Sequence, residues 1–372
     1  MTQAKKVLEE IKDTYKCKIS KTIGEIEITV FAERLDCELF LREMEEYLPK
    51  SNRNVRYPLK VVYSRSDLVY EKFLKVLHSE KGKVHIIYKN AEKAKKALRY
   101  ELDGIDFFYN SMDDYILGIY EDYIYIFTTH KTQESDRLFF RVIVEFIISI
   151  KEVSGFLMIH GGAVALDGKG LLICGEKKAG KSTLIVKLLK YMGTKFIAND
   201  KTFVTPDYQE IESYPMVVKL GETTFRYCIG KDRNIKLYRK NANYQYVQKE
   251  DFTTDKWELT PHELADIMGR EYVLGAKLHM IIIPEIVQGT TCSLKKIDTE
   301  KKNFLEESNL FGDSLRREEW ILSDYWKWKI SKQKNVNKIE IPVYKLQYGS
   351  ETAWTEIIRV LRECTNSIKG EM

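Results

Sequence analysis

A glycine-rich segment near the middle of the chain has the residue types needed to hold a phosphate. Residues 175–182 read GEKKAGKS and fit the pattern G-x-x-x-x-G-K-[ST]. An apolar stretch of strand length, residues 170–174, comes directly before it, and residues 183–190 follow with apolar side chains at helical spacing. Strand, glycine loop and helix start is the context in which this pattern binds nucleotides. The sequence therefore predicts a phosphate-binding loop for a nucleoside triphosphate.

Each part of this segment has an expected task. Gly175 and Gly180 let the backbone curl so that successive N–H groups point at phosphate oxygens, and the positive end of the helix dipole adds to the attraction. Lys181 would reach the outer phosphates, and the Ser182 hydroxyl would hold a magnesium ion. The residues expected to bind the nucleotide are Gly175, Lys178, Ala179, Gly180, Lys181, Ser182 and Thr183.

Alternatives stay open for three side chains of the segment. Lys177 and Lys178 either clamp phosphate or lie in solvent, because an exposed lysine costs little. Thr183 either contacts the α-phosphate or only starts the helix, and the affinity of helix starts for anions favours the contact.

A second candidate group follows the next apolar strand. Residues 194–198 have the pattern of a buried strand and end in Asn199-Asp200. A carboxylate in this position after a phosphate loop commonly holds magnesium, so Ser182 and Asp200 are the predicted metal ligands. Further along, Lys219 and Arg226 are candidate contacts for the substrate, and a structural role is the alternative for each.

Composition and charge limit the class of protein. The 372 residues are 44% hydrophobic and 31% charged, which indicates a globular protein with more than one domain. The net charge of +5 is modest: it would suit an anionic ligand but does not by itself indicate nucleic acid, whose binders usually have a stronger basic patch, so nucleic acid is not the expected partner. The longest apolar run, residues 138–150, is too short to cross a bilayer. Six cysteines without C-x-x-C spacing and no apolar signal region favour a cytoplasmic protein that does not bind membranes; a homo-oligomer stays open.

The elements before the loop suggest two domains. Strands are expected at residues 25–30, 59–63, 83–88, 115–120 and 123–127, and helices at 36–48, capped by Asp36, and at 91–100. Glu121-Asp122 between the last two strands predicts a hairpin. The polar stretch 130–136 marks the expected boundary between a small α+β domain, residues 1–135, and a nucleotide-binding domain, residues 136–372.

The second half alternates strands and helices around the loop. A helix is expected at 137–153, a strand at 156–166 followed by an Asp167-Gly168 hairpin turn, strands at 201–205, 216–220, 278–283 and 339–348, and a closing helix at 352–364. Residues 230–257 are expected to form a long loop or an insertion. Residues 326–329, WKWK, have the aromatic and basic alternation of a nucleic-acid patch, although a short helix with buried tryptophans explains them equally well.

From residue 137 to 204 the chain resembles the catalytic domain of HPr kinase/phosphorylase and the wider family of HPr-kinase-like P-loop kinases, which are related in fold to phosphoenolpyruvate carboxykinase. The matching features are an apolar helix, a strand with His160-Gly161, the Asp167-Gly168 turn, the phosphate loop and the strand that ends in Asn199-Asp200. The resemblance implies an α/β fold with a mixed-sheet catalytic domain, ATP and Mg²⁺ as cofactors, and kinase activity. It also implies an active-site role for His160, as proton relay or phosphate contact.

Three departures separate the chain from an orthodox HPr kinase. The family carries Asp-Asp where this chain has Asn199-Asp200, and the first Asp is the general base, whereas a neutral amide cannot accept the proton. The signature linked to phosphorylase activity is not visible near residues 264–275, and Lys177-Lys178 replace the usual Ser-Gly. The catalytic residues implied are His160, Lys181, Asn199 and Asp200, with Asn199 holding a water, the acceptor or magnesium.

These observations predict a kinase with a substrate of its own. We expect transfer of the γ-phosphoryl group of ATP to a hydroxyl, either Ser/Thr of a peptide or protein, a biosynthetic precursor peptide among them, or a small metabolite. One alternative is a non-catalytic, nucleotide-gated binding protein, for which Asn199 is the main argument. A kinase that acts on nucleic acid is a third, supported only by the net charge and residues 326–329.

Overall fold

The chain forms two compact units, which are described separately. The computed structural model describes residues 3–49, 54–89, 94–111, 114–129, 135–176, 178–221, 224–225, 238–240, 246–248, 256–289, 291–298, 319–320, 340–349 and 351–367. Unit 1 comprises residues 1–150, 238–249 and 316–331, and unit 2 comprises 151–237, 250–315 and 332–372. The predicted domain division at residues 135 and 136 stays a prediction.

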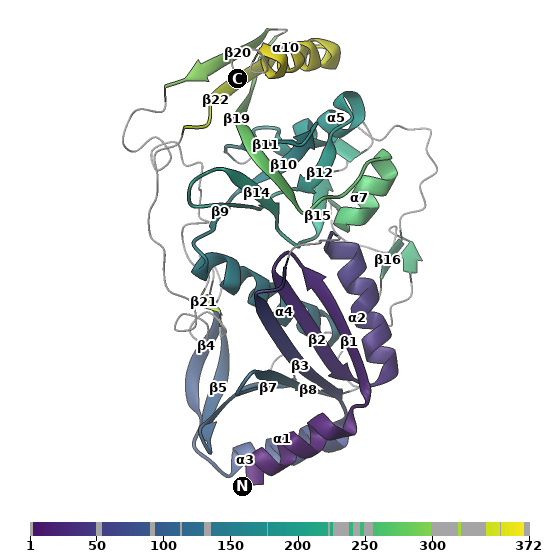
Figure 1. Ribbon diagram of the computed structural model, residues 1–372, viewed down its shortest axis with the longest axis vertical. Coiled ribbons are helices and arrows are strands. Elements are labelled where there is room, and N and C mark those ends of the chain that lie inside the picture. The colour runs from purple at the N-terminus through teal and green to yellow at the C-terminus, as the bar shows by residue number, and fades with distance from the viewer. Residues whose placement is uncertain are drawn as a thin grey trace. The chain divides into compact units, whose positions relative to one another are not determined.

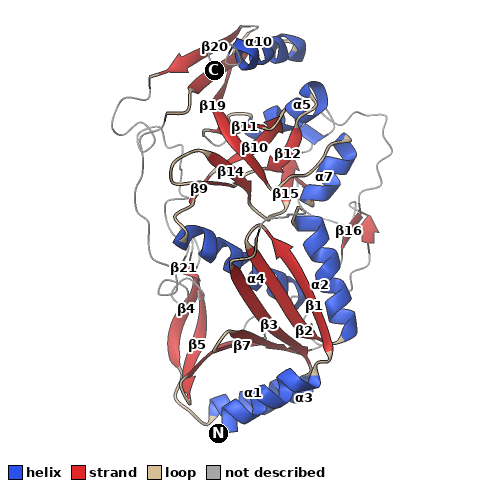
Figure 2. Cartoon of the chain, in the orientation of Figure 1, coloured by secondary structure: helices blue, strands red, loops and turns tan. Residues whose placement is uncertain are grey.

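Unit 1 is built on a mixed nine-stranded sheet with the order β1-β2-β3-β8-β7-β6-β5-β4-β21 (Figures 1 and 2). Its strands are β1 (Cys17–Ile23), β2 (Ile26–Ala32), β3 (Tyr57–Arg65), β4 (Lys83–Lys89), β5 (Ala94–Leu102), β6 (Ile105–Asn110), β7 (Tyr115–Tyr120), β8 (Tyr123–Thr128) and β21 (Glu319–Trp320). Its helices are α1 (Gln3–Thr14), α2 (Arg34–Tyr47), α3 (Asp67–His78) and α4 (Ser135–Val153), the last of which runs on into unit 2. The short hairpin β16 (Tyr238–Lys240) and β17 (Tyr246–Gln248) also belongs to this unit.

Helices cover both faces of this sheet, which explains why its central strands are apolar on consecutive residues. In β3, Val61 and Tyr63 pack in one core with α2 and α4, whereas Val62 packs in the other core with α1 and α3. The pairs β2–β3 and β3–β8 are parallel. Parallel strands buried on both faces are continuous runs of hydrophobic residues.

Most of the elements expected in this part of the chain are present. The predicted strands correspond to β2, β3, β4, β7 and β8, and the predicted hairpin around Glu121-Asp122 joins β7 and β8 as an antiparallel pair. The helix expected at residues 91–100 is wrong, because residues 94–102 form β5. This strand pairs with β4 and β6 on its two sides, so ladder hydrogen bonds override the helical preference of its alanines and lysines.

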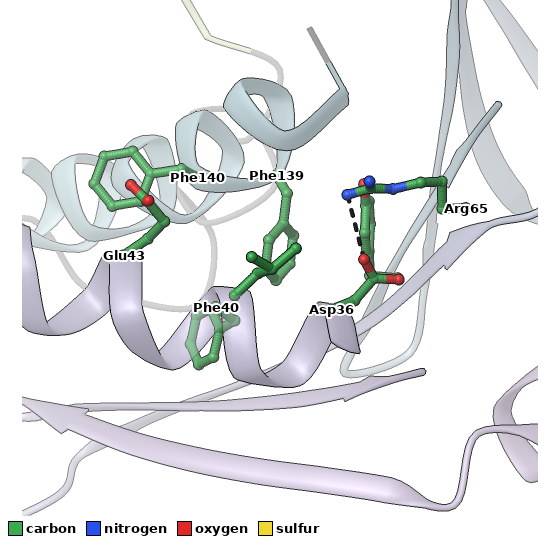
Figure 3. A pocket seen from close by; sticks show the side chains of 8 residues that line it. Asp36, Phe40, Glu43, Arg65, Phe139 and Phe140 are labelled. Atoms are coloured by element: carbon green, nitrogen blue, oxygen red, sulfur yellow. Dashed lines mark ion pairs between the residues drawn. The ribbon is translucent and has the colours of Figure 1, made fainter. Parts of the chain in front are cut away.

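Asp36 does not cap α2, as the sequence suggested. The helix begins at Arg34, and Asp36 lies in its first turn, where its carboxylate is 7% exposed and 3.2 Å from the Arg65 guanidinium. Figure 3 shows this ion pair beside Phe40 and Phe139, at a cavity of about 10 Å³. The carboxylate therefore serves a buried ion pair rather than the backbone N–H groups of the helix start.

Unit 2 is built on a second mixed sheet, in which β12-β10-β11-β19-β14-β13-β9 follow one another and β22 pairs with β19 and β20. Its strands are β9 (Leu157–Ile159), β10 (Gly161–Leu166), β11 (Lys169–Cys174), β12 (Lys195–Ala198), β13 (Thr202–Val204), β14 (Glu210–Ser213), β19 (Gly275–Val287), β20 (Cys292–Ile297) and β22 (Val343–Gly349), with the separate pair β15 (Val218–Gly221) and β18 (Lys256–Leu259). Its helices are α5 (Lys181–Met192), α7 (Pro261–Met268) and α10 (Trp354–Ser367), which share one core (Figure 1). Among the helices that the structure describes, none is long and apolar enough to cross a membrane.

Two expectations for this region need correction. Residues 156–166 are not one strand, because the chain breaks at His160 into β9, which pairs with β13, and β10, which pairs with β11 and β12. Residues 230–257 are not simply a loop, since they contain β16, β17 and the first residues of β18. Residues 326–329 lie outside the described residues.

The antiparallel pairing of β10 determines which strand ends lie side by side. Its first residue, Gly161, pairs with Cys174 at the end of β11, and Ala163 pairs with Ala198 at the end of β12. Both neighbours run opposite to β10. The start of β10 therefore lies beside the carboxyl ends of β11 and β12.

Gly162 allows these strands to approach α5. A Cβ at this position would overlap the Cδ1 atom of Ile185 in α5 and would lie 2.8 Å from the carbonyl oxygen of Ala198 and 3.1 Å from the Cα of Asn199. Two of these three atoms belong to the backbone and cannot move away as a flexible side chain could. Glycine is therefore required by the packing.

We predict that Gly162→Ala destabilises unit 2 by about 1–3 kcal/mol, because a methyl group added to a close-packed site forces the backbone to shift. Urea unfolding followed by circular dichroism measures the change. Gly221→Ala is the matched control, since a Cβ there meets nothing within 4 Å. Equal stability of the two variants would contradict this account of the packing.

Candidate functional site

The segment between β11 and α5 is curled at three positions. Gly175 has a φ angle of 137°, Lys178 of 70° and Gly180 of 91°, so all three lie on the left-handed side of backbone space. The amide of Ala179 donates to the carbonyl of Glu176 at 3.2 Å, which closes the turn. The sequence expected this strand, loop and helix in this order, and the structure contains them; phosphate binding by the loop stays a prediction.

The first turn of α5 faces the end of this loop. Gly180 is the N-cap residue, and within the described residues no side chain caps the helix start. The N–H groups of a helix's first turn lack partners inside the helix and attract anions. A Cβ on Gly180 would overlap the hydroxyl of Tyr348 in β22, so the loop passes directly over this ring. Only a residue without a side chain fits there.

Lys181 folds back onto the loop. Its ammonium group donates to the carbonyl oxygens of Gly175 at 2.8 Å and Glu176 at 2.9 Å. Burial lowers the pKa of Lys181 below its ordinary value, and the charge of Asp200 partly offsets this effect. A partly desolvated ammonium group interacts more strongly with an anion than one in bulk water. Lys181 is therefore a cation directed at the space inside the loop.

Asn199 and Asp200 follow β12 at the same edge of the sheet. The φ angle of Asp200 is 71°, an uncommon conformation for a residue with a side chain. Its carboxylate lies 3.7 Å from Nδ1 of His160, and both side chains are partly exposed, at 48% and 37%. Asn199 is 4% exposed, and its Oδ1 atom has no hydrogen-bond partner among the described residues. An unpaired buried acceptor is costly, and such positions are often retained for a ligand or water.

The pairing of β10 explains how His160 reaches these groups. His160 is the residue at the break directly before β10, and β10 starts beside the ends of β11 and β12. Its imidazole therefore approaches the carboxylate that follows β12, while the loop with Lys181 follows β11. The influence of Asp200 on the pKa of Lys181 agrees with this proximity. Four of the predicted residues thus lie at three neighbouring strand ends: His160 before β10, Lys181 after β11, and Asn199 and Asp200 after β12.

The remaining predicted residues lie in the first turn of α5, on β15 or outside the described residues. Ser182 is half-buried in the first turn of α5, and the hydroxyl of Thr183 lies 3.0 Å from that of Thr224. Lys219 is exposed on β15, opposite Glu258 of β18, and its role as a substrate contact stays a prediction. Lys177 and Arg226 lie outside the described residues.

Two residues beside the loop were not predicted. Tyr348 is 4% exposed, its hydroxyl is buried without a partner in the described part of the chain, and burial raises its pKa to about 12. Cys174 ends β11, and burial raises the pKa of its thiol to about 12, while the charge of Lys181 acts in the opposite direction. No local pattern marks Tyr348, because its position depends on the pairing of β22 with β19.

Comparisons with known proteins give limited information about this chain. No family model matches it, and no curated protein does. Among solved structures, the Hpr(Ser) kinase/phosphatase from Coxiella burnetii is distantly similar, with 15% sequence identity and a TM-score of 0.26 over 57% of this chain and 93% of that chain. At this identity and score the similarity supports no argument about activity.

We predict that Lys178→Gly leaves the protein at least as stable as the original, and that Lys178→Val is less stable than the glycine variant by about 1–2 kcal/mol. The reason is the φ angle of 70°, which glycine adopts freely and a β-branched residue adopts at a steric cost of about this size. Because Lys178 is exposed, neither change removes core packing. Thermal unfolding of the two variants is the measurement, and a valine variant as stable as the glycine variant would contradict the loop conformation.

Proposed function

We propose that this protein is an ATP- and magnesium-dependent kinase that transfers the γ-phosphoryl group to a hydroxyl of a peptide or protein, or of a small metabolite. The observation that carries the proposal is the position of the Lys181 ammonium group, which is held on two loop carbonyls and is close enough to Asp200 for their charges to interact. A cation inside a curled backbone loop and a carboxylate beside it are the two charges that a magnesium nucleotide requires.

The loop residues suit a chain of phosphates. Left-handed backbone at Gly175, Lys178 and Gly180 supports the concave arrangement of N–H groups known from anion-binding loops. On binding, the ammonium group of Lys181 would exchange its carbonyl partners for phosphate oxygens. Because the group is already partly desolvated, less water has to be removed at that step.

Ser182 and Asp200 are the residues that would hold magnesium. The structure contains no cluster of three or more His, Cys, Asp or Glu side chains suited to a metal ion among the residues it describes. A nucleotide-bound magnesium ion does not require such a cluster, because it keeps several waters and uses only one or two protein ligands besides the phosphates. The partial exposure of the Asp200 carboxylate leaves room for such a hydrated ion.

Bound magnesium nucleotide would supply the transferable phosphoryl group and most of the charge neutralisation. The chain's own part is to hold and orient: Lys181 stabilises the charge that develops on the outer phosphate, and the buried Asn199 Oδ1 accepts a hydrogen bond from a water or the acceptor. His160, 3.7 Å from Asp200, is the group that can take a proton from the acceptor hydroxyl. A loose transition state needs little base strength, so the amide at Asn199 is compatible with transfer.

A second function is favoured by Asn199 itself. A protein that holds ATP as a switch needs the loop, Lys181 and magnesium ligands but no base. The neutral side chain of Asn199, 4% exposed and positioned next to Asp200, fits such a protein equally well. The two functions differ in whether a third molecule becomes phosphorylated.

We expect Lys181→Ala to reduce phosphoryl transfer by at least about 100-fold, the scale of removing one strong electrostatic contact to the transferring group. Lysate of the source cells with γ-labelled ATP identifies the labelled acceptor and gives the rate. The control is Lys190→Ala, an exposed lysine at the other end of α5, which should keep full activity. Wild-type turnover in a folded Lys181→Ala protein would rule out the kinase proposal.

Asn199→Asp should separate the kinase from the switch. In a kinase we expect a several-fold faster transfer with unchanged ATP affinity, because burial raises the pKa of a carboxyl group toward the range useful for a general base. A switch would gain nothing, since no acceptor is bound. Asn110→Asp, at a second buried asparagine, controls for the general cost of a buried carboxylate to stability. ATP binding without any gain in transfer would favour the switch.

A further inference from the structure

Unit 2 has a cavity at the opposite end of β11 from the loop. Its volume is about 170 Å³; the turn between β10 and β11 supplies Asp167, β11 supplies Lys169, β19 supplies His279 and α10 supplies Arg362. Leu171 and Met192 add apolar lining. Because Lys169 begins β11 and the loop follows its last residue, Cys174, this cavity is separate from the candidate active site.

Positive charge gathers around this cavity. Lys169 and Lys277 are register partners on the parallel strands β11 and β19. Like charges directly opposite one another on neighbouring strands repel and destabilise the pair. Arg362 adds a third cation, and Asp167 is the one carboxylate among the lining residues that the structure describes. Glu210 of β14 lies opposite Lys277 on its other side and offsets part of this repulsion. The residues that line the cavity, Lys169 and Arg362 against Asp167, still carry a net positive charge that a bound anion would balance.

His279 supplies an unsatisfied polar atom in the same cavity. Its Nε2 atom is buried and has no hydrogen-bond partner among the described residues. Burial lowers the pKa of His279, and the charges of Lys169 and Lys277 lower it further. A buried polar nitrogen without a partner costs free energy that a hydrogen-bonding ligand recovers. An oxyanion can accept a hydrogen bond from Nε2–H of His279. Its negative charge also offsets the effect of the two lysines on the pKa of His279.

Arg362 keeps donors available for such a ligand. One of its terminal N–H groups donates to the carbonyl of Tyr191 at 2.8 Å, and a guanidinium carries five N–H donors. The C-terminal end of α5 lies next to the cavity and carries partial negative charge, which would repel an anion. The hydrogen bond from Arg362 places a positive charge at this helix end. Arg362 and Arg270, which donates to the carbonyl of Leu189 at 2.7 Å, neutralise that helix end.

We propose that this cavity is a binding site for a small anion that carries a phosphate or carboxylate group, held by Lys169, His279 and Arg362. The volume of about 170 Å³ exceeds that of one water, whose share of liquid is about 30 Å³, and is below the range of about 300–1,000 Å³ typical of pockets for drug-sized ligands. The ligand is accordingly an inorganic or few-carbon anion and not a nucleotide. This site does not depend on the proposed kinase activity.

Histidine NMR on the full chain tests the proposal at this cavity alone. The protein, with its six histidines labelled, is titrated with inorganic phosphate and, separately, with succinate at constant ionic strength. The His279 ring signals, assigned by their loss in His279→Gln, should shift and saturate with at least one of the two anions. The comparison of the anions tells whether phosphate or carboxylate is the group recognised. Anions held by the phosphate loop would move His160 instead, so the two sites are read separately.

Two arginines on the same helix form a matched pair of variants. We expect Arg362→Gln to weaken the binding at least about tenfold, the scale of losing one hydrogen bond to a charged group. Arg359→Gln should bind as the original does, because Arg359 is exposed and is paired with Glu356 and Glu363. Thermal unfolding with and without phosphate gives a second measurement, since a ligand of the folded state raises its stability. His279 signals that respond to neither anion, or equal loss in both arginine variants, would overturn the proposal.

Discussion

The candidate active site depends on how closely β10 can approach its two neighbours and α5. Gly162 leaves no space for even one methyl group between β10, the end of β12 and Ile185. With this contact in place, antiparallel pairing brings the start of β10 to the ends of β11 and β12. His160, the loop with Lys181 and the Asn199-Asp200 pair are then neighbours without any further arrangement. A change of backbone spacing here would separate three groups at once.

The three polar residues at this edge of the sheet differ in charge and in burial. Lys181 is partly desolvated and turned inward, Asp200 is half exposed beside it, and Asn199 is buried and neutral. A second carboxylate buried at position 199 would need its own partner, because an unpaired buried charge is costly. The amide avoids this cost and leaves an acceptor atom for a ligand.

The sequence indicates the local parts of this site, and the tertiary contacts supply the rest. The glycine pattern, the apolar run before it and the helical spacing after it are short-range signals, and β11 and α5 agree with them. The helix expected at residues 91–100 is wrong because alanine and lysine favour helices in isolation, whereas pairing with two neighbouring strands makes residues 94–102 a strand. His160 as a break between strands, Tyr348 under Gly180 and the grouping of Lys169 with His279 all depend on pairings between distant segments. No single-sequence pattern encodes such pairings.

The parallel pairing of β11 with β19 has a consequence for the order in which the protein folds. The hairpin β10–β11, the loop and α5 are contiguous in sequence and can form early, because closing short loops costs little entropy. The other edge of β11 pairs with β19, which follows about a hundred residues later, and β19 in turn pairs with β22. During synthesis from the ribosome, β11 therefore exposes an unpaired edge until β19 emerges. Such an edge attracts other extended chains, so the nascent protein is prone to aggregate in that interval.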